Sequence, residues 1–137
     1  MFAVNGEEVC GLVEPGCGLS SVRAKARRLL NASGIDNLAR TEILTIINEL
    51  GMNILRHAGS GEICLKIVGC GGRRGIFIVA NDSGPGIGDL EAALQPGFSE
   101  DKGLGLGLAA IHRLSDEVRI ATLIPHGTRV EVFKWIS

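Results

Sequence analysis

Apolar residues recur every three or four positions in two segments of the first half of the chain. They are Val22, Ala26, Leu29 and Leu30 in residues 19–34, and Ile43, Ile47, Leu50 and Ile54 in residues 35–61. This spacing places the side chains on one face of a helix, so two amphipathic helices are predicted. Ser20 or Ser21 is expected to cap the start of the first helix, and Gly34 to end it. Gly59 and Gly61 are expected to end the second.

Shorter apolar runs, some alternating with polar residues, indicate strands. The expected strands are residues 7–13, 62–70, 74–82, 118–124 and 128–136. The second and third of these are predicted to form a hairpin around the sequence GGRR. A third helix is expected over residues 106–117 and a short one over residues 89–94. This order of elements predicts an α+β fold with helices on one face of a mixed sheet.

The length, net charge and composition of the chain exclude several classes of protein. A length of 137 residues suits one domain, predicted to span residues 1–137. The net charge of −1 and the absence of Tyr argue against nucleic-acid binding. No apolar run is long enough to span a bilayer, and the first residues lack the pattern of a signal peptide. The expected location is therefore the cytoplasm, with no membrane partner.

The four cysteines are Cys10, Cys17, Cys64 and Cys70. Neither the first two nor the last two have the two-to-four-residue spacing of a zinc knuckle. In a cytoplasmic chain they are expected to stay reduced. The sequence therefore predicts buried or half-buried thiols that pack as small apolar groups.

Three polar residues, Glu49, Asn53 and His57, are spaced four apart in the second predicted helix. They therefore share one flank of it. The amide oxygen of Asn53 is a suitable ligand for Mg²⁺. The carboxylate of Glu49 can accept a proton from a hydroxyl nucleophile or a water. The alternative is an ordinary polar flank of a surface helix, on which His57 caps carbonyl groups near the helix end.

The sequence NDSGPG follows the predicted strand 74–82 directly. Asp82 stands where strand becomes loop, a favoured place for ligand contacts. An ionised Asp only accepts hydrogen bonds, so it can recognise the exocyclic amine of adenine. Gly84 and Gly86 have no Cβ and let the backbone approach a planar ring. The alternative is a tight turn, because Asp, Gly and Pro are turn-forming residues.

The sequence GLGLGL, residues 103–108, leads into the third predicted helix. Glycines before a helix N-terminus expose several N–H groups at the positive end of the helix dipole, where phosphates bind. The spacing differs from that of a Walker loop, because no GK[ST] follows and Lys102 precedes the glycines. Alone the loop is weak evidence, but the polar flank, the Asp-Gly loop and this loop together predict a nucleotide site.

The three motifs resemble those of the GHKL ATP-binding family, which includes gyrase, heat-shock chaperone, histidine kinase and mismatch-repair ATPases. The ExxxN motif of that family reads ELGMN here, its DxGxG adenine loop reads DSGPG, and its second glycine box reads GLGLGL. A late GT corresponds to Gly127 and Thr128. The resemblance covers residues 41–137. It implies a Bergerat fold, a two-layer sandwich with a mixed, mostly antiparallel sheet and helices on one face.

The resemblance also implies the cofactors and the roles of residues. ATP and Mg²⁺ would be bound, with Glu49 as the catalytic base and Asn53 as the metal ligand. Nucleotide contacts are implied at Asn53, Asp82, Gly84, Gly86, Lys102, Gly103, Gly105, Gly107, Leu108 and Thr128. The connection between Gly86 and Gly103 corresponds to the lid of the family and is short here.

Within the family, the short lid and the segments IHRLSDEVRI and GTRVEVFKW resemble the RsbT-type serine kinases. This implies phosphorylation of Ser or Thr on a STAS-domain partner in a stress or sigma-factor partner-switching pathway, and activation of a PP2C-type phosphatase. Leu106 and Ala109 depart from the RsbT-type pattern, which often has Ala and Pro there. The alternatives are an RsbW-like anti-sigma factor that binds a sigma factor, an ATP-dependent binding module without kinase activity, and a plain ATP hydrolase. A homodimer is also left open.

Overall fold

A computed structural model describes residues 3–84, 105–123 and 127–136. Their strands form one sheet in the order β1-β2-β3-β5-β4. The bounds are β1 Ala3–Val13, β2 Gly61–Cys70, β3 Arg73–Asp82, β4 Glu117–Leu123 and β5 Gly127–Trp135. Every pairing in this order is antiparallel. The predicted α+β class is confirmed. The sequence predicted a mixed, mostly antiparallel sheet, and the described strands form a fully antiparallel one.

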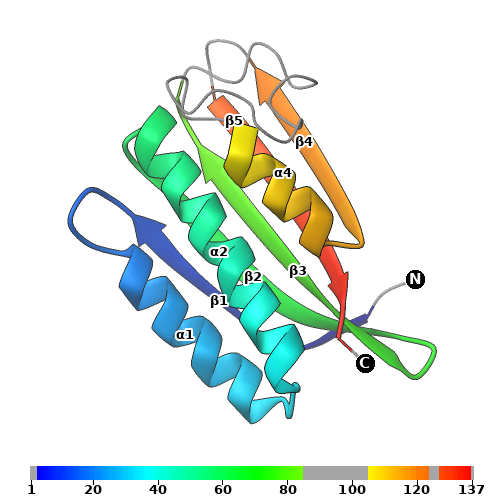
Figure 1. The fold of residues 1–137 in the computed structure, drawn as a ribbon. Helices are drawn as coiled ribbons and strands as arrows, with labels where there is room; N and C mark the ends of the chain where they lie inside the picture. Colours follow the sequence, from blue (N-terminus) through cyan, green and yellow to red (C-terminus); the bar gives the residue numbers. More distant parts are fainter. Residues whose placement is uncertain (1–2, 85–104, 124–126, 137) are drawn as a thin grey trace.

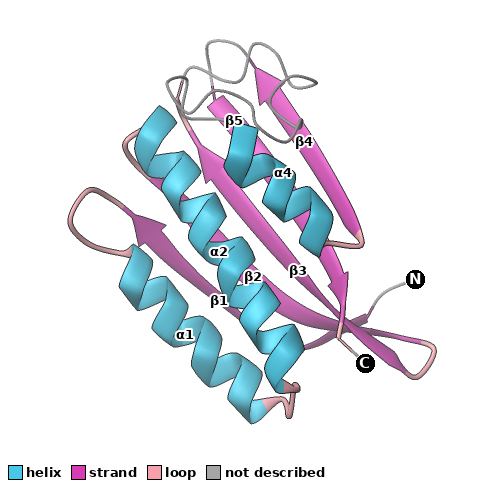
Figure 2. Ribbon diagram, in the orientation of Figure 1, coloured by secondary structure: helices cyan, strands magenta, loops and turns pink. Residues whose placement is uncertain are grey.

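The helices of the described residues lie on one face of this sheet (Figures 1 and 2). They are α1 Leu19–Ala32, α2 Asn37–His57 and α4 Gly105–Leu114. α2 runs across the middle of the sheet, with α1 on one side of it and α4 on the other (Figure 1). The short helix predicted over residues 89–94 lies outside the described residues. Within the part of the chain that the structure describes, no helix is both long and apolar enough to span a membrane.

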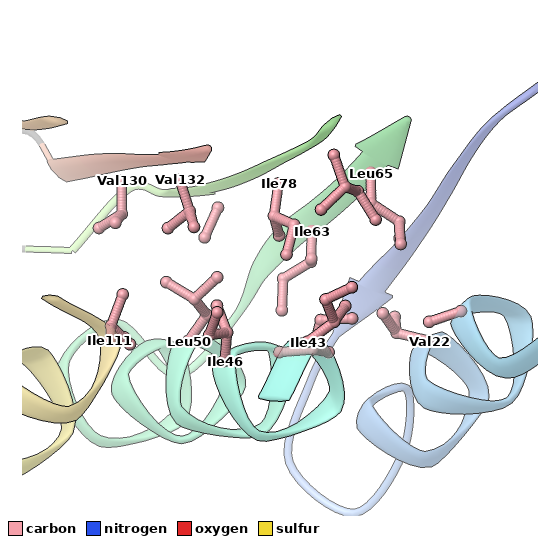
Figure 3. Close-up of a cluster of buried hydrophobic side chains, with 14 of the residues drawn as sticks. Val22, Ile43, Ile46, Leu50, Ile63, Leu65, Ile78, Ile111, Val130 and Val132 are labelled. Atoms are coloured by element: carbon pink, nitrogen blue, oxygen red, sulfur yellow. The ribbon is translucent and has the colours of Figure 1, made fainter. Parts of the chain in front are cut away.

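The core fills the space between the helices and the sheet. The predicted apolar stripe of α2 is buried, with Ile43, Ile47, Leu50 and Ile54 at most 2% exposed. Alternate residues of the strands meet this stripe, among them Ile63 and Leu65 of β2, Ile78 of β3, and Val130 and Val132 of β5 (Figure 3). The apolar residues that recur every second position in the strands and every 3.6 positions in the helices therefore pack together in one layer.

Local signals set most element boundaries. Asp36 caps α2 by accepting a hydrogen bond from the amide of Ala39 at 2.9 Å. Gly71 and Gly72 form the turn between β2 and β3, and both have positive φ, as the tightest hairpin turns require. The prediction that Ser20 or Ser21 caps α1 is wrong. The residue at that position is Gly18, which has no side chain to donate or accept a bond.

The prediction of reduced cysteines is wrong for Cys10 and Cys64, and the prediction of burial is wrong for Cys17. Cys10 and Cys64 form a disulfide, although 54 residues separate them. Cys17 is an exposed thiol. The prediction relied on an expected cytoplasmic location and on spacing along the chain, whereas the antiparallel register of β1 and β2 places Cys10 directly opposite Cys64.

Candidate functional site

The polar flank of α2 faces the first turns of α4. Gly107 of α4 is buried, and a Cβ at this position would lie 2.9 Å from Oε2 of Glu49 and 3.2 Å from Oδ1 of Asn53. A Cβ essentially never lies within 3.0 Å of another atom, so a side chain at this position would displace the carboxylate of Glu49 and press on Asn53. The fold thus brings Glu49, Asn53 and the second glycine motif together, as the sequence predicts.

The carboxamide of Asn53 is buried at this contact. Both its Oδ1 and its Nδ2 lack a hydrogen-bond partner among the described residues. An unpaired polar group inside a protein costs about 1–3 kcal/mol, and nearly all such groups are paired in native structures. A water, a bound ligand or a metal ion could supply the partners that this amide lacks among the described residues.

Asp82 is held at the end of β3 by two backbone amides. Its Oδ1 accepts hydrogen bonds from the amide of Gly84 at 2.9 Å and from the amide of Thr128 at 3.3 Å. Thr128 lies opposite Asp82 in the register of β3 and β5, so the sheet itself sets this contact. Both bonds end on Oδ1, which leaves Oδ2 as the acceptor for a ligand within the described part of the site.

A small cavity of about 20 Å³ joins these residues. Its lining comes from α2, the end of β3, α4 and the start of β5, and consists of Leu50, Asn53, Ile54, His57, Ala80, Asp82, Leu108, Thr128 and Val130. This volume is room for about one water molecule. A purine can therefore enter only if the pocket widens. Leu108 is 1% exposed, so it acts as an apolar wall of the cavity as well as part of the core.

Gly84 has a packing role that differs from the predicted approach to a planar ring. A Cβ here would lie 2.8 Å from Cβ of Ala58 and 2.9 Å from the carbonyl oxygen of His57. The missing side chain therefore lets the chain after β3 pack against the C-terminal end of α2. This contact fixes the distance between Asp82 and the helix that carries Asn53.

The remaining predicted positions divide into two groups. Gly105 begins α4, at the helix end expected to face phosphates. Gly86, Lys102 and Gly103 lie outside the described residues. Sequence reasoning missed the apolar walls of the cavity, Leu50, Ile54, Ala80 and Val130, because their periodicity identified them as core and nothing in the pattern marks which core residues also face a pocket.

The donor set fits ATP and a hard divalent cation. Asn53 offers a buried neutral oxygen, Glu49 a carboxylate, and both adjoin the N-terminal turns of α4. Mg²⁺ prefers such oxygen ligands and keeps several waters, and phosphates bind at helix N-termini. The unpaired amide is the observation that supports the fit, since a bound nucleotide would supply the partners that the described protein atoms do not.

Comparison with known proteins gives the family. Residues 15–134 match the model of the histidine kinase-like ATPase domain. The chain is 32% identical over 130 residues to the serine/threonine-protein kinase RsbT of Bacillus subtilis (strain 168), covering 95% of this chain and 98% of the relative. It is 30% identical over 104 residues to an anti-sigma F factor of Anoxybacillus flavithermus, covering 71% of this chain and 70% of the relative. The chain therefore belongs to the histidine kinase-like ATPase domain family.

Proposed function

We propose that this chain is an ATP- and Mg²⁺-dependent kinase, one domain over residues 1–137, that phosphorylates a serine or threonine of a STAS-domain partner. The observation that carries the proposal is the buried, unpaired carboxamide of Asn53, which lies with Glu49 against Gly107 of α4. The arrangement leaves two α2 side chains directed at the helix end where phosphates bind. A nucleotide with its metal would complete the bonds that the fold leaves open.

The class of enzyme follows from the relatives. With 32% identity over 95% of its length to a serine/threonine-protein kinase, the chain is a protein serine/threonine kinase of the same type. The family membership supports ATP as the phosphate donor. The STAS-domain acceptor, the stress or sigma-factor pathway and the PP2C-type phosphatase partner rest on the RsbT-like motifs and are the finer part of the proposal.

Adenine would be recognised at the end of β3. Oδ1 of Asp82 is already engaged by two backbone amides, so the carboxylate is oriented before a ligand arrives. Its Oδ2 can then accept from the exocyclic amine, directly or through a water. Leu108 and Thr128 line the same cavity and would contact the nucleotide, with Gly84 holding the loop in place. Gly86, Lys102 and Gly103 belong to the same proposal.

Phosphoryl transfer depends mainly on positioning and electrostatics. The amides of Gly105 and Gly107 stand in the first turn of α4, where the helix dipole favours the charge of the phosphates. Asn53 would hold Mg²⁺ through its amide oxygen, and the ion would neutralise charge on the triphosphate. Glu49 would accept the proton of the partner's hydroxyl as the oxygen of that hydroxyl bonds to the γ-phosphorus and ADP leaves.

A second function is favoured by the other relatives. Anti-sigma F factors match about 70% of this chain, at 30% identity for the one from Thermoanaerobacter sp. (strain X514). Their name states an action on a sigma factor, so sequestration of a sigma factor is the alternative to an RsbT-like role. A module that uses ATP only to set its shape would show the same binding without transfer of phosphate.

Transfer of labelled phosphate tests the proposal. Purified protein is incubated with Mg²⁺, ATP labelled at the γ-phosphate, and a STAS-domain protein of the source organism. Label on the STAS protein, lost when its acceptor Ser or Thr is changed to Ala, is the expected result. ATP binding with no label on the partner would identify a binding module. Release of inorganic phosphate without any labelled protein would identify a hydrolase.

A further inference from the structure

The face of the sheet opposite the helices carries a second cluster of reactive side chains. Cys10 of β1 and Cys64 of β2 are direct partners in the antiparallel register, with their Cα atoms 4.1 Å apart. The carbonyl oxygen of Cys10 accepts a bond from Nζ of Lys25 at 3.0 Å. Both facts indicate that Cys10 and Cys64 form a non-hydrogen-bonded pair of the antiparallel ladder. Side chains come closest to each other at such pairs. The register thus brings the two sulfur atoms together.

Glu62 joins the two cysteines on this face. It lies two residues before Cys64 in β2, so its side chain leaves the sheet on the same side. One carboxylate oxygen of Glu62 and the two sulfur atoms all lie within 4.8 Å of one another. Glu62 is exposed, and the cysteines are half-buried. The cluster therefore combines two soft ligands and one hard ligand at a place that solvent can reach.

Ions can approach this cluster from the uncovered side of the sheet. A hollow of about 190 Å³ adjoins Cys64 and is lined in part by Glu8, Lys66, Phe77 and Val79. All of the described helices lie on the other face (Figure 1). The nucleotide cavity is formed by α2 and α4 against that helix-covered face, so the two places do not share lining residues.

We propose that Cys10, Cys64 and Glu62 form a binding site for a thiophilic divalent cation of the zinc class when the disulfide is reduced. Reduction by a dithiol reductant adds two electrons and two protons and gives two thiols. Binding of the metal then displaces both protons, because the thiolate is the ligand. Two thiolates on one tetrahedral zinc lie about 3.8 Å apart, given Zn–S bonds of about 2.3 Å, and adjacent strands easily span that separation.

The site was hidden from the sequence because its ligands are far apart along the chain. Zinc motifs are usually identified from cysteines two to four residues apart. Here 54 residues separate the two cysteines, and only the pairing of β1 with β2 unites them. With three protein ligands, a water would take the fourth position, the arrangement typical of open zinc sites. The disulfide and the metal-bound dithiolate are alternative states of the same two side chains.

Cadmium is the probe, because its bonds to thiolate absorb in the near ultraviolet. Full-length protein is reduced, freed of reductant without oxygen, and titrated with Cd²⁺ in the absence of nucleotide. We expect one ion per chain and release of about two protons on binding. The unfolding temperature should rise with Cd²⁺, since the metal binds the folded state. The same protein with its disulfide intact is the matched control and should lack the thiolate absorption that the reduced pair adds.

Variants separate this site from the other cysteines. Cys64→Ser and Cys10→Ser should each abolish the near-ultraviolet absorption of Cd²⁺ bound at this site. Glu62→Gln should weaken Cd²⁺ binding by roughly tenfold or more. The double variant Cys17→Ser, Cys70→Ser should bind Cd²⁺ as the unchanged protein does. The proposal is overturned if the reduced protein binds no ion, or if Cys64→Ser and the oxidised protein bind it as tightly as the reduced protein.

Discussion

Two asparagines of α2 lie five positions apart and have opposite surroundings. Oδ1 of Asn48 accepts a hydrogen bond from the guanidinium of Arg23 on α1 at 2.9 Å. The amide of Asn53 is buried and has no partner among the described residues. Both residues have the same helix propensity, and the same helix holds both. Asn48 therefore stabilises the contact of α1 with α2, whereas Asn53 is held in a state that costs stability.

The two glutamates of α2 repeat this contrast. Glu42 forms an ion pair with Lys134 of β5, whose Nζ lies 3.3 Å from Oε1 of Glu42 and also donates to the carbonyl of Leu114. Glu49, two turns further, has no such cation among the described residues and faces Gly107 instead. Asn48 and Glu42 are thus paired within the fold, whereas Glu49 and Asn53, which have no such partner among the described residues, lie where α2 meets α4. This is the pattern expected of a site shaped for a ligand.

The largest effect is expected for Glu49→Gln, which removes the proposed base and keeps the size of the side chain. Phosphate transfer should fall by about 10²–10⁴-fold while ATP still binds, because general-base assistance contributes that much. The measurement is single-turnover transfer from labelled ATP, with calorimetry for binding. Glu42→Gln is the control, and it should retain the transfer rate at a temperature where it is folded. Equal rates for Glu49→Gln and the unchanged protein would rule out the base.

The next effect is on nucleotide binding by the two asparagine variants. Asn53→Ala should weaken binding of ATP in the presence of Mg²⁺ by about 100-fold or more, because it removes the proposed metal ligand. Asn48→Ala should bind ATP as the unchanged protein does, since its partner is Arg23 on the far side of α2. Titration calorimetry with and without Mg²⁺ measures both. Unaltered affinity of Asn53→Ala would refute the metal assignment.

The same pair of variants should differ in stability in the opposite sense. Asn48→Ala loses a hydrogen bond to a charged group, whereas Asn53→Ala removes a buried amide that is unpaired. The gain in helix propensity is the same at both positions, so it cancels in the comparison. Without nucleotide, Asn53→Ala should be the more stable variant by about 1–2 kcal/mol in urea unfolding. If Asn53→Ala is the less stable, the amide has a partner in the protein.

The smallest effect is expected for Gly107→Ala. Alanine is favoured over glycine within a helix by about 1 kcal/mol, so α4 itself should not be weakened. The new methyl group would meet Oε2 of Glu49 at 2.9 Å, and this flexible side chain can turn away. Displacement of Glu49 and Asn53 should then lower the transfer rate by roughly tenfold, because small misplacements of reacting groups are costly. A stable variant with full activity would show that Gly107 has only a packing role.

Local patterns in the sequence were sufficient for the main elements of the fold. The apolar stripe of α2, the alternation in β2 and the continuous apolar run of β3 mark these segments as one helix and two strands, so all three could be predicted from the sequence pattern. The cap of α1 could not, because Gly18 satisfies the position without the side-chain signal that prediction relies on. The disulfide between Cys10 and Cys64 depends on which strands pair, and that information is not local.

In the candidate site, too, some features follow from local sequence and others from contacts between distant segments. Glu49, Asn53 and Asp82 were predicted as site residues because three motifs occur together in one small domain, since each motif alone also fits an ordinary helix flank or turn. The bond from the amide of Thr128 to Asp82 follows from the pairing of β3 with β5, which no local pattern specifies. The packing of Gly84 against Ala58 is likewise a tertiary contact. The sequence therefore predicted which side chains form the candidate site, and the structure adds the contacts that orient them.

The cavity beside Asn53 is proposed to bind a nucleotide together with its metal. Titration calorimetry of the unchanged protein with ATP tests this most directly, once with Mg²⁺ and once with a chelator. One ATP per chain should bind with a saturable heat, and binding should be much weaker with the chelator. If ATP releases no heat at several temperatures, with or without Mg²⁺, the buried amide of Asn53 is not a nucleotide site.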